Sequence, residues 1–130
     1  MLRSFVKSAF ELLKPGGRMV GINTSPFVTT RDAFASTHKY RLRYTTDNET
    51  CEEGDPLHIE IEGEDFLAKF DNYFWTSDSY QKAFEDCGFV NFRWVPLAVH
   101  SDDEEHWRAW KENCPLICFE AKKPEYHGSS

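Results

Sequence analysis

The first 23 residues place an amphipathic helix, a glycine turn and an apolar run in immediate succession, and this order restricts the fold more than any other feature of the sequence. Apolar residues recur at helical spacing over Leu2–Lys14, with charged residues on the opposite face. Pro15-Gly16-Gly17 ends this helix because Pro cannot continue it and Gly tolerates a left-handed backbone. The run Met19-Val20-Gly21-Ile22 is typical of a strand covered on both faces, which predicts a strand over Arg18–Asn23. Helix, turn and buried strand together indicate one half of an α/β unit in a parallel sheet.

The middle of the chain has the two-residue period of strands with one covered face. Apolar and polar residues alternate over Tyr40–Thr45 and again over Leu57–Glu62, on either side of a polar loop. A third, aromatic stretch runs over Phe66–Trp75. These segments predict an inserted antiparallel β meander, in which basic residues of one strand face acids of another on a solvated face.

The α/β pattern then resumes. A helix is predicted over Ser77–Cys87, with Gly88 in the left-handed position that ends it. We expect strands over Phe89–Val95 and Leu116–Lys122, paired antiparallel. The capping-box spacing at Ser101-Asp102-Asp103-Glu104 opens a further helix between them.

Composition describes one ordinary globular domain. The chain has 130 residues and a net charge of -7, so bulk charge attracts neither nucleic acid nor anionic lipid. No apolar run approaches the roughly 20 residues of a membrane helix, and no signal-peptide pattern opens the chain. We therefore expect a cytoplasmic protein without a nucleic-acid or membrane partner. The four cysteines are interpreted as buried or half-buried free thiols, with no metal site.

Three segments resemble the C-terminal half of a class I S-adenosylmethionine-dependent methyltransferase. Leu12-Leu13-Lys14-Pro15-Gly16-Gly17-Arg18 resembles the turn before that family's fifth strand. The segment Tyr80–Phe89 is similar to its helix that ends in Gly-Phe, and Pro115–Pro124 is similar to its closing strand. Methyltransferases of the toxoflavin and ubiquinone/menaquinone type are the most similar members.

This resemblance implies an α/β fold: the C-terminal half of a Rossmann-like, doubly wound sheet with an antiparallel last strand, into which the β meander is inserted. It assigns residues 1–124 to a methyltransferase-like domain and 125–130 to a polar tail. It also implies S-adenosylmethionine as the cofactor. The family binds this cofactor with a Gly-rich loop after its first strand, and no such loop occurs here. We therefore expect a truncated domain that lacks the cofactor-binding half, and we assign no cofactor-binding residue.

The remaining chemistry lies at the carboxyl ends of the strands, where ligands bind in open α/β sheets. Asn23 and Thr24 end the first strand and are candidate contacts for a small-molecule methyl acceptor, although both types are also common turn formers. Tyr73 and Trp75 are candidates for an aromatic wall over the acceptor, with core packing as the alternative. Core packing is favoured for Phe74.

No catalytic residue is assigned, because methyl transfer depends on alignment and desolvation more than on a strong acid or base. His58 and His106 are interpreted as surface residues. A different class of function also fits: a non-catalytic α+β interaction module that pairs with another chain through an exposed sheet edge.

Overall fold

The computed structural model describes residues 2–125, which divide into two compact units. The first unit takes residues up to Asn23, Ser77–Pro96 and the chain from Ile117, and the second takes Thr24–Thr76 and Leu97–Leu116. The predicted polar tail lies, apart from Glu125, outside the described residues. None of the helices within residues 2–125 combines the length and the apolar character needed to cross a membrane.

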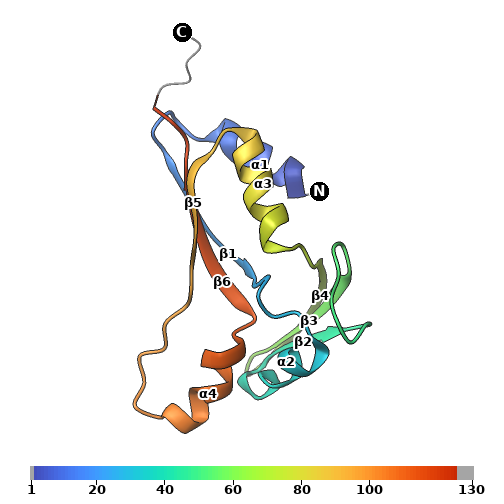
Figure 1. Cartoon of the computed structure of the whole chain (residues 1–130). Coiled ribbons are helices and arrows are strands. Elements are labelled where there is room, and N and C mark those ends of the chain that lie inside the picture. Colours follow the sequence, from blue (N-terminus) through green and yellow to red (C-terminus); the bar gives the residue numbers. More distant parts are fainter. Residues whose placement is uncertain (1, 126–130) are drawn as a thin grey trace. The chain divides into compact units, whose positions relative to one another are not determined.

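The first unit combines two helices with a three-stranded sheet (Figure 1). Its elements, in chain order, are α1 (Leu2–Leu12), β1 (Arg18–Thr24), α3 (Ser77–Cys87), β5 (Val90–Val95) and β6 (Leu116–Lys122). The strand order is β1-β6-β5, so the last strand of the chain lies in the middle of the sheet.

Both pairs of neighbouring strands in this sheet are antiparallel. Trp94 of β5 lies opposite Phe119 of β6, which confirms the predicted pairing of these two strands. At the other edge of β6, the Lys123 N–H donates to the Gly17 carbonyl over 2.8 Å, so the end of β6 lies beside the start of β1. The parallel pairing expected for β1 is not present among the described strands. Instead, β1 and β5 run in the same direction on either side of β6.

Among the described residues of this unit, helices cover one face of the sheet. A Cβ built on Gly21 would lie 2.5 Å from the Phe119 ring, so Gly21 of β1 and Phe119 of β6 share a face. Phe84 of α3 packs on Phe119 with ring centroids 5.4 Å apart, and that face is the helical one. Val20 and Ile22 lie on the other face and are 62% and 55% exposed. The expectations of a strand covered on both faces and of a doubly wound sheet are therefore wrong for the described residues, because α1 and α3 lie on one side.

The turns of this unit follow the glycines as predicted. Gly16 has a φ of 83° and Gly88 a φ of 114°, both in the left-handed region that favours glycine. The helix α1 ends at Leu12, two residues before the predicted end. The Lys123 ammonium donates to the carbonyls of Phe10 and Leu13, both over 2.9 Å, and so satisfies backbone oxygens at the end of α1.

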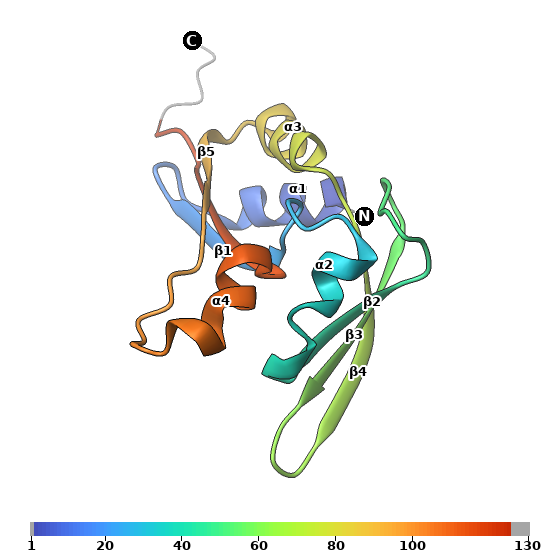
Figure 2. The same cartoon turned by 60° about the horizontal axis from the view of Figure 1, so that its bottom comes forward.

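The second unit contains the predicted antiparallel meander (Figure 2). Its strands are β2 (Leu42–Thr46), β3 (Pro56–Glu62) and β4 (Leu67–Tyr73), in the order β2-β3-β4. Arg43 lies opposite Glu60 and contacts both Glu60 and Glu62, which confirms the pairing of basic and acidic residues on the solvated face.

A short helix closes the other face of the meander. This helix, α2 (Arg31–Ala35), places Phe34 against Tyr44 with ring centroids 5.4 Å apart. Phe34, Tyr44, Leu57, Ile59 and Phe74 belong to one buried cluster, which confirms core packing for Phe74. The sequence did not predict α2, nor the 3₁₀ helix η1 (His38–Tyr40) that follows it.

The last helix of this unit is α4 (Glu104–Asn113), and its cap differs from the prediction. Asp103 is the N-cap, and its carboxylate accepts from the His106 N–H over 3.0 Å. Ser101 accepts instead from the Asp103 N–H, outside the helix. Tyr40 of η1 stacks on Trp107 of α4 with ring centroids 5.0 Å apart, which holds α4 against η1.

Candidate functional site

A buried polar cluster forms where β1 ends and the second unit begins. Thr24 is only 5% exposed, and its hydroxyl donates to the Tyr44 hydroxyl over 3.2 Å. The Asn72 side-chain amide, from β4, donates in turn to the Thr24 hydroxyl over 3.4 Å. Three polar side chains from three strands therefore meet through one threonine oxygen.

The Tyr44 hydroxyl is a neutral group in this cluster. The ring is 3% exposed, and burial raises the pKa of Tyr44 while the hydrogen bond from Thr24 lowers it to a lesser extent. A neutral phenol can accept or donate a hydrogen bond but is a poor general base near neutral pH. This cluster can therefore position a ligand or a neighbouring side chain, and it is unsuited to proton abstraction.

Of the two residues predicted to form an aromatic wall, Tyr73 lies on the opposite face of β4 from Asn72. Tyr73 alternates with Asn72 along β4, so its ring lies on the solvated face of the meander with Asp71 and is 40% exposed. Trp75 follows the end of β4 and is half-buried. Asn23, one residue before Thr24, is also half-buried.

One aromatic side chain of β4, that of Phe70, shares a face of the strand with Asn72. Phe70 lies two residues before Asn72 on the core-side face of β4 and is 48% exposed. Ile61 lies on the same face of β3 and is 37% exposed. We call Thr24, Tyr44, Phe70 and Asn72 the Asn72 surface. The alternation of Phe70, Asp71 and Asn72 in the sequence indicates that Phe70 and Asn72 share one face of a strand. Only the register of β4 against β3 shows that this face is the core-side one.

His58 and His106 do not belong to the Asn72 surface, so neither is placed to act there as a general base. His58 lies on the solvated face of β3, where Nδ1 contacts Asp71 at 2.9 Å and Nε2 contacts Asp47 at 3.0 Å. The hydrogen bond with Asp71, and then that with Asp47, raises the pKa of His58. His106 is exposed on α4, so both histidines are surface residues as expected.

The cysteines are free thiols, buried at Cys51 and half-buried at Cys87, Cys114 and Cys118, as predicted. Within the described part of the chain, no three His, Cys, Asp or Glu side chains gather closely enough to hold a metal ion.

The only glycine pair in the sequence is already engaged in the turn after α1. The Gly16 N–H donates to the Lys123 carbonyl over 3.0 Å, and the Gly17 N–H donates to the Lys14 carbonyl over 2.8 Å. Cofactor loops of this fold class need glycine N–H groups that face the ligand. Gly16 and Gly17 therefore do not fit S-adenosylmethionine.

Comparison with known proteins found similar chains among solved structures. No protein-family model and no curated protein matches the chain. A crystal structure of a S-adenosylmethionine-dependent methyltransferase from Clostridium acetobutylicum ATCC 824 is similar, with 14% sequence identity and a TM-score of 0.48. The match covers 94% of this chain and 50% of that one, so the chain spans half the length of the similar methyltransferase.

Proposed function

We propose that this chain is the acceptor-side half of an S-adenosylmethionine-dependent methyltransferase that acts on a small molecule. The observation that carries the proposal is the order of the first unit's elements. A helix that ends in Gly88-Phe89 leads into β5, and the closing strand β6 then returns antiparallel to it. These are the elements that the three sequence segments imply, at the same residues.

In this proposal the acceptor lies against the Asn72 surface. Asn72 supplies a polar contact and Phe70 an exposed aromatic face, while Thr24 holds the Asn72 amide in place. Asn23, at the carboxyl end of β1, remains a candidate contact, and so do Tyr73 and Trp75 near the end of β4. The cofactor-binding groups come from polypeptide outside these 130 residues.

A titration of the ¹⁵N-labelled chain tests the acceptor side. The probes are 1,4-naphthoquinol, as a planar acceptor, and S-adenosylhomocysteine, as the cofactor product. We expect the quinol to shift the amides of Thr24, Phe70 and Asn72, and we expect Asn72→Ala to weaken its binding. The exposed variant Gln81→Ala, on α3, is the control. Shifts caused by S-adenosylhomocysteine alone, or equal quinol binding by the two variants, would overturn this assignment.

The second candidate, an interaction module, is favoured by a separate observation. The strand β1 lies at the edge of its sheet and presents Val20 and Ile22 on the uncovered face. On α1, Phe5 is 51% and Leu12 is 86% exposed. These two residues are seven positions apart, so they lie on the same face of α1. An open strand edge beside exposed apolar residues is a typical surface for pairing with another chain.

The two candidates differ in what binds this edge. For the methyltransferase, the edge pairs with a cofactor-binding half and the product acquires affinity for S-adenosylmethionine. For the interaction module, the edge pairs with a partner and no such affinity appears. Calorimetry measures whether the isolated complex of this chain and its partner at the β1 edge binds S-adenosylmethionine. Binding supports the methyltransferase, and its absence supports the interaction module.

A further inference from the structure

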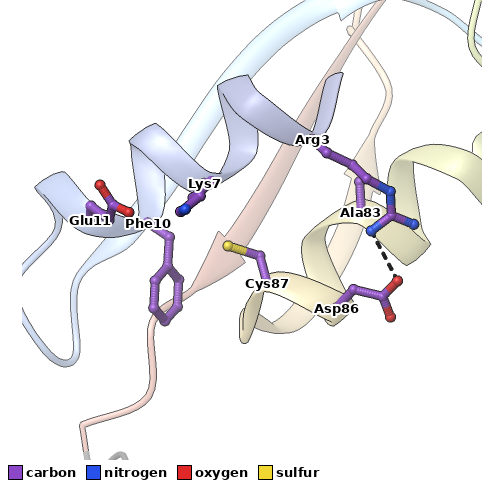
Figure 3. Close-up of a pocket in the computed structure, with 7 residues that line it drawn as sticks. All are labelled: Arg3, Lys7, Phe10, Glu11, Ala83, Asp86 and Cys87. Carbon is purple, nitrogen blue, oxygen red and sulfur yellow. Dashed lines mark ion pairs between the residues drawn. The ribbon is translucent and has the colours of Figure 1, made fainter. Parts of the chain in front are cut away.

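A groove of about 480 Å³ runs between α1 and α3 in the first unit. Its lining residues come from these two helices alone (Figure 3). Sites for small molecules commonly enclose about 300–1,000 Å³, so the groove is large enough for one. It belongs to neither the Asn72 surface nor the free edge of β1.

The apolar lining of the groove consists of Phe10, Ala83 and Cys87, and contacts with neighbouring residues hold the Phe10 ring in place. The Phe10 ring meets the edge of Phe89 with centroids 5.1 Å apart and an interplanar angle of 82°. On the same ring, the Lys123 ammonium lies 4.5 Å from the centroid. Ala83 is 2% exposed, and the Cys87 sulfur points toward α1 in Figure 3. Because these contacts hold the Phe10 ring in one orientation, the groove offers a preformed flat surface.

The Cys87 thiol adds no negative charge to this surface. Burial raises the pKa of Cys87, and the nearby Glu11 carboxylate adds to that rise, while Lys7 and Lys123 oppose it. The thiol is therefore neutral near neutral pH and behaves as a small apolar group.

The charges of the groove are arranged along α1. Arg3 is paired with Asp86 of α3, with Nη1 and Oδ2 3.0 Å apart, at one end of the groove. Lys7, one turn further, forms no ion pair with any other described residue. Glu11 follows after another turn and is likewise without an ion-pair partner in the described chain. An anion is therefore attracted beside Lys7 and repelled beside Glu11.

We infer that the α1–α3 groove binds a small, flat, apolar molecule that carries one anionic group. The apolar body lies against Phe10, Ala83 and Cys87, and the anion lies beside Lys7 on the Arg3 side. In this arrangement the Lys7 ammonium faces the anionic group of the ligand, and the Phe10 ring faces its apolar body. The inference does not rest on the proposed methyltransferase function.

A titration with naphthalene-2-sulfonate, followed by ¹H–¹⁵N NMR of the whole chain, tests the inference. We expect amide shifts confined to α1 and α3, and slower alkylation of Cys87 by iodoacetamide when the probe is present. Lys7→Gln is expected to weaken binding about fivefold, as the loss of one exposed charge contact implies. Lys82→Gln, an exposed change of the same charge on α3 outside the groove, is expected to leave the dissociation constant unchanged.

Three results would overturn the inference. The first is equal weakening by Lys7→Gln and Lys82→Gln, which would reduce the effect to net charge. The second is equally tight binding of uncharged 2-methylnaphthalene, which would make the groove an apolar contact surface for another polypeptide. The third is shifts centred on Val20 and Ile22, which would place the probe on the open sheet face. Circular dichroism of both variants verifies that each is folded.

Discussion

His58 shows how one exposed side chain links three segments of the meander. Its imidazole bridges Asp71 of β4 and Asp47, which follows β2, while the residue itself lies in the middle strand. As an imidazolium, the ring donates through both nitrogens to carboxylates, and these bonds raise the pKa of His58 above 6.5 in the folded chain. The bridge is therefore strongest when His58 is charged.

This bridge predicts a pH dependence with a definite sign. A group whose pKa is higher in the folded state stabilises that state fully below its unfolded pKa, and this stabilisation is lost as pH rises through the folded pKa. We expect the melting temperature of the wild type to fall more between about pH 6 and pH 8 than that of His58→Gln. Thermal melts of both variants measure this difference. His100→Gln, an exposed histidine in a loop, is the control and should follow the wild type. Parallel curves for the wild type and His58→Gln would contradict the bridge.

Gly21 carries a second constraint at the residue scale. Its backbone lies under the Phe119 ring, where an added Cβ would come within 2.5 Å of the ring carbon Cζ. Phe119 is 2% exposed and also contacts Phe84 and Phe92, so the ring has little room to move.

We therefore expect Gly21→Ala to destabilise the chain by about 1–3 kcal/mol through overpacking. Phe119→Leu shortens the side chain over β1, so the double variant should be more stable than the sum of the two single losses predicts. Urea unfolding of the four chains measures this coupling. Strict additivity, or a Gly21→Ala chain as stable as the wild type, would place the Phe119 ring elsewhere.

At the scale of the elements, local signals predicted most of the helices and strands. Gly16 and Gly88 have the positive φ values that their positions after helices require. The alternation over Leu57–Glu62 gave β3, and its buried positions are Leu57 and Ile59. The short helix α2 was missed because its five residues hold too few apolar positions for a period to be recognised.

The faces of the strands were harder to predict than the strands themselves. Tyr73, Phe74 and Trp75 are consecutive, so their order along the chain does not say which ring faces the core. The pairing of His58 with Asp71 sets the register of β4 and puts Tyr73 on the solvated face. Likewise, the apolar residues Val20 and Ile22 do not reveal from the sequence alone whether other described residues pack on both faces of β1. Of the candidate site, the sequence identified Thr24, whereas Asn72, Phe70 and Tyr44 required the three-dimensional pairing.

The open edge of β1 predicts that the isolated chain self-associates. Exposed Val20 and Ile22, on a strand with one unpaired edge, should drive self-association of the isolated chain at high concentration. Ile22→Lys places a charge on this face and should shift sedimentation toward the monomer without lowering the melting temperature, because the side chain is already 55% exposed. Thr45→Lys, on the exposed face of the meander, is the matched control. An unchanged sedimentation profile for Ile22→Lys would mean that the edge does not associate.

At the scale of the whole molecule, the two units differ in net charge. The residues of the first unit carry 8 basic and 6 acidic side chains, and those of the second carry 7 and 16, which together give the net charge of -7. Bulk attraction to an anion is therefore weakest for the second unit, which contains the Asn72 surface. If the proposed function is correct, this distribution favours a neutral or cationic acceptor there. The groove of the first unit instead offers the ammonium of Lys7, which has no ion-pair partner among the described residues.

Under the proposed function, the 130 residues carry the acceptor side of a methyltransferase and lack the groups that hold its cofactor. Isothermal titration calorimetry of S-adenosylmethionine into the isolated chain measures whether those groups are missing. We expect no measurable heat of binding, or a dissociation constant in the millimolar range, because the N–H groups of Gly16 and Gly17 are already bonded within the turn. A micromolar dissociation constant, about -8 kcal/mol, would require a complete cofactor site within this chain and would contradict the claim.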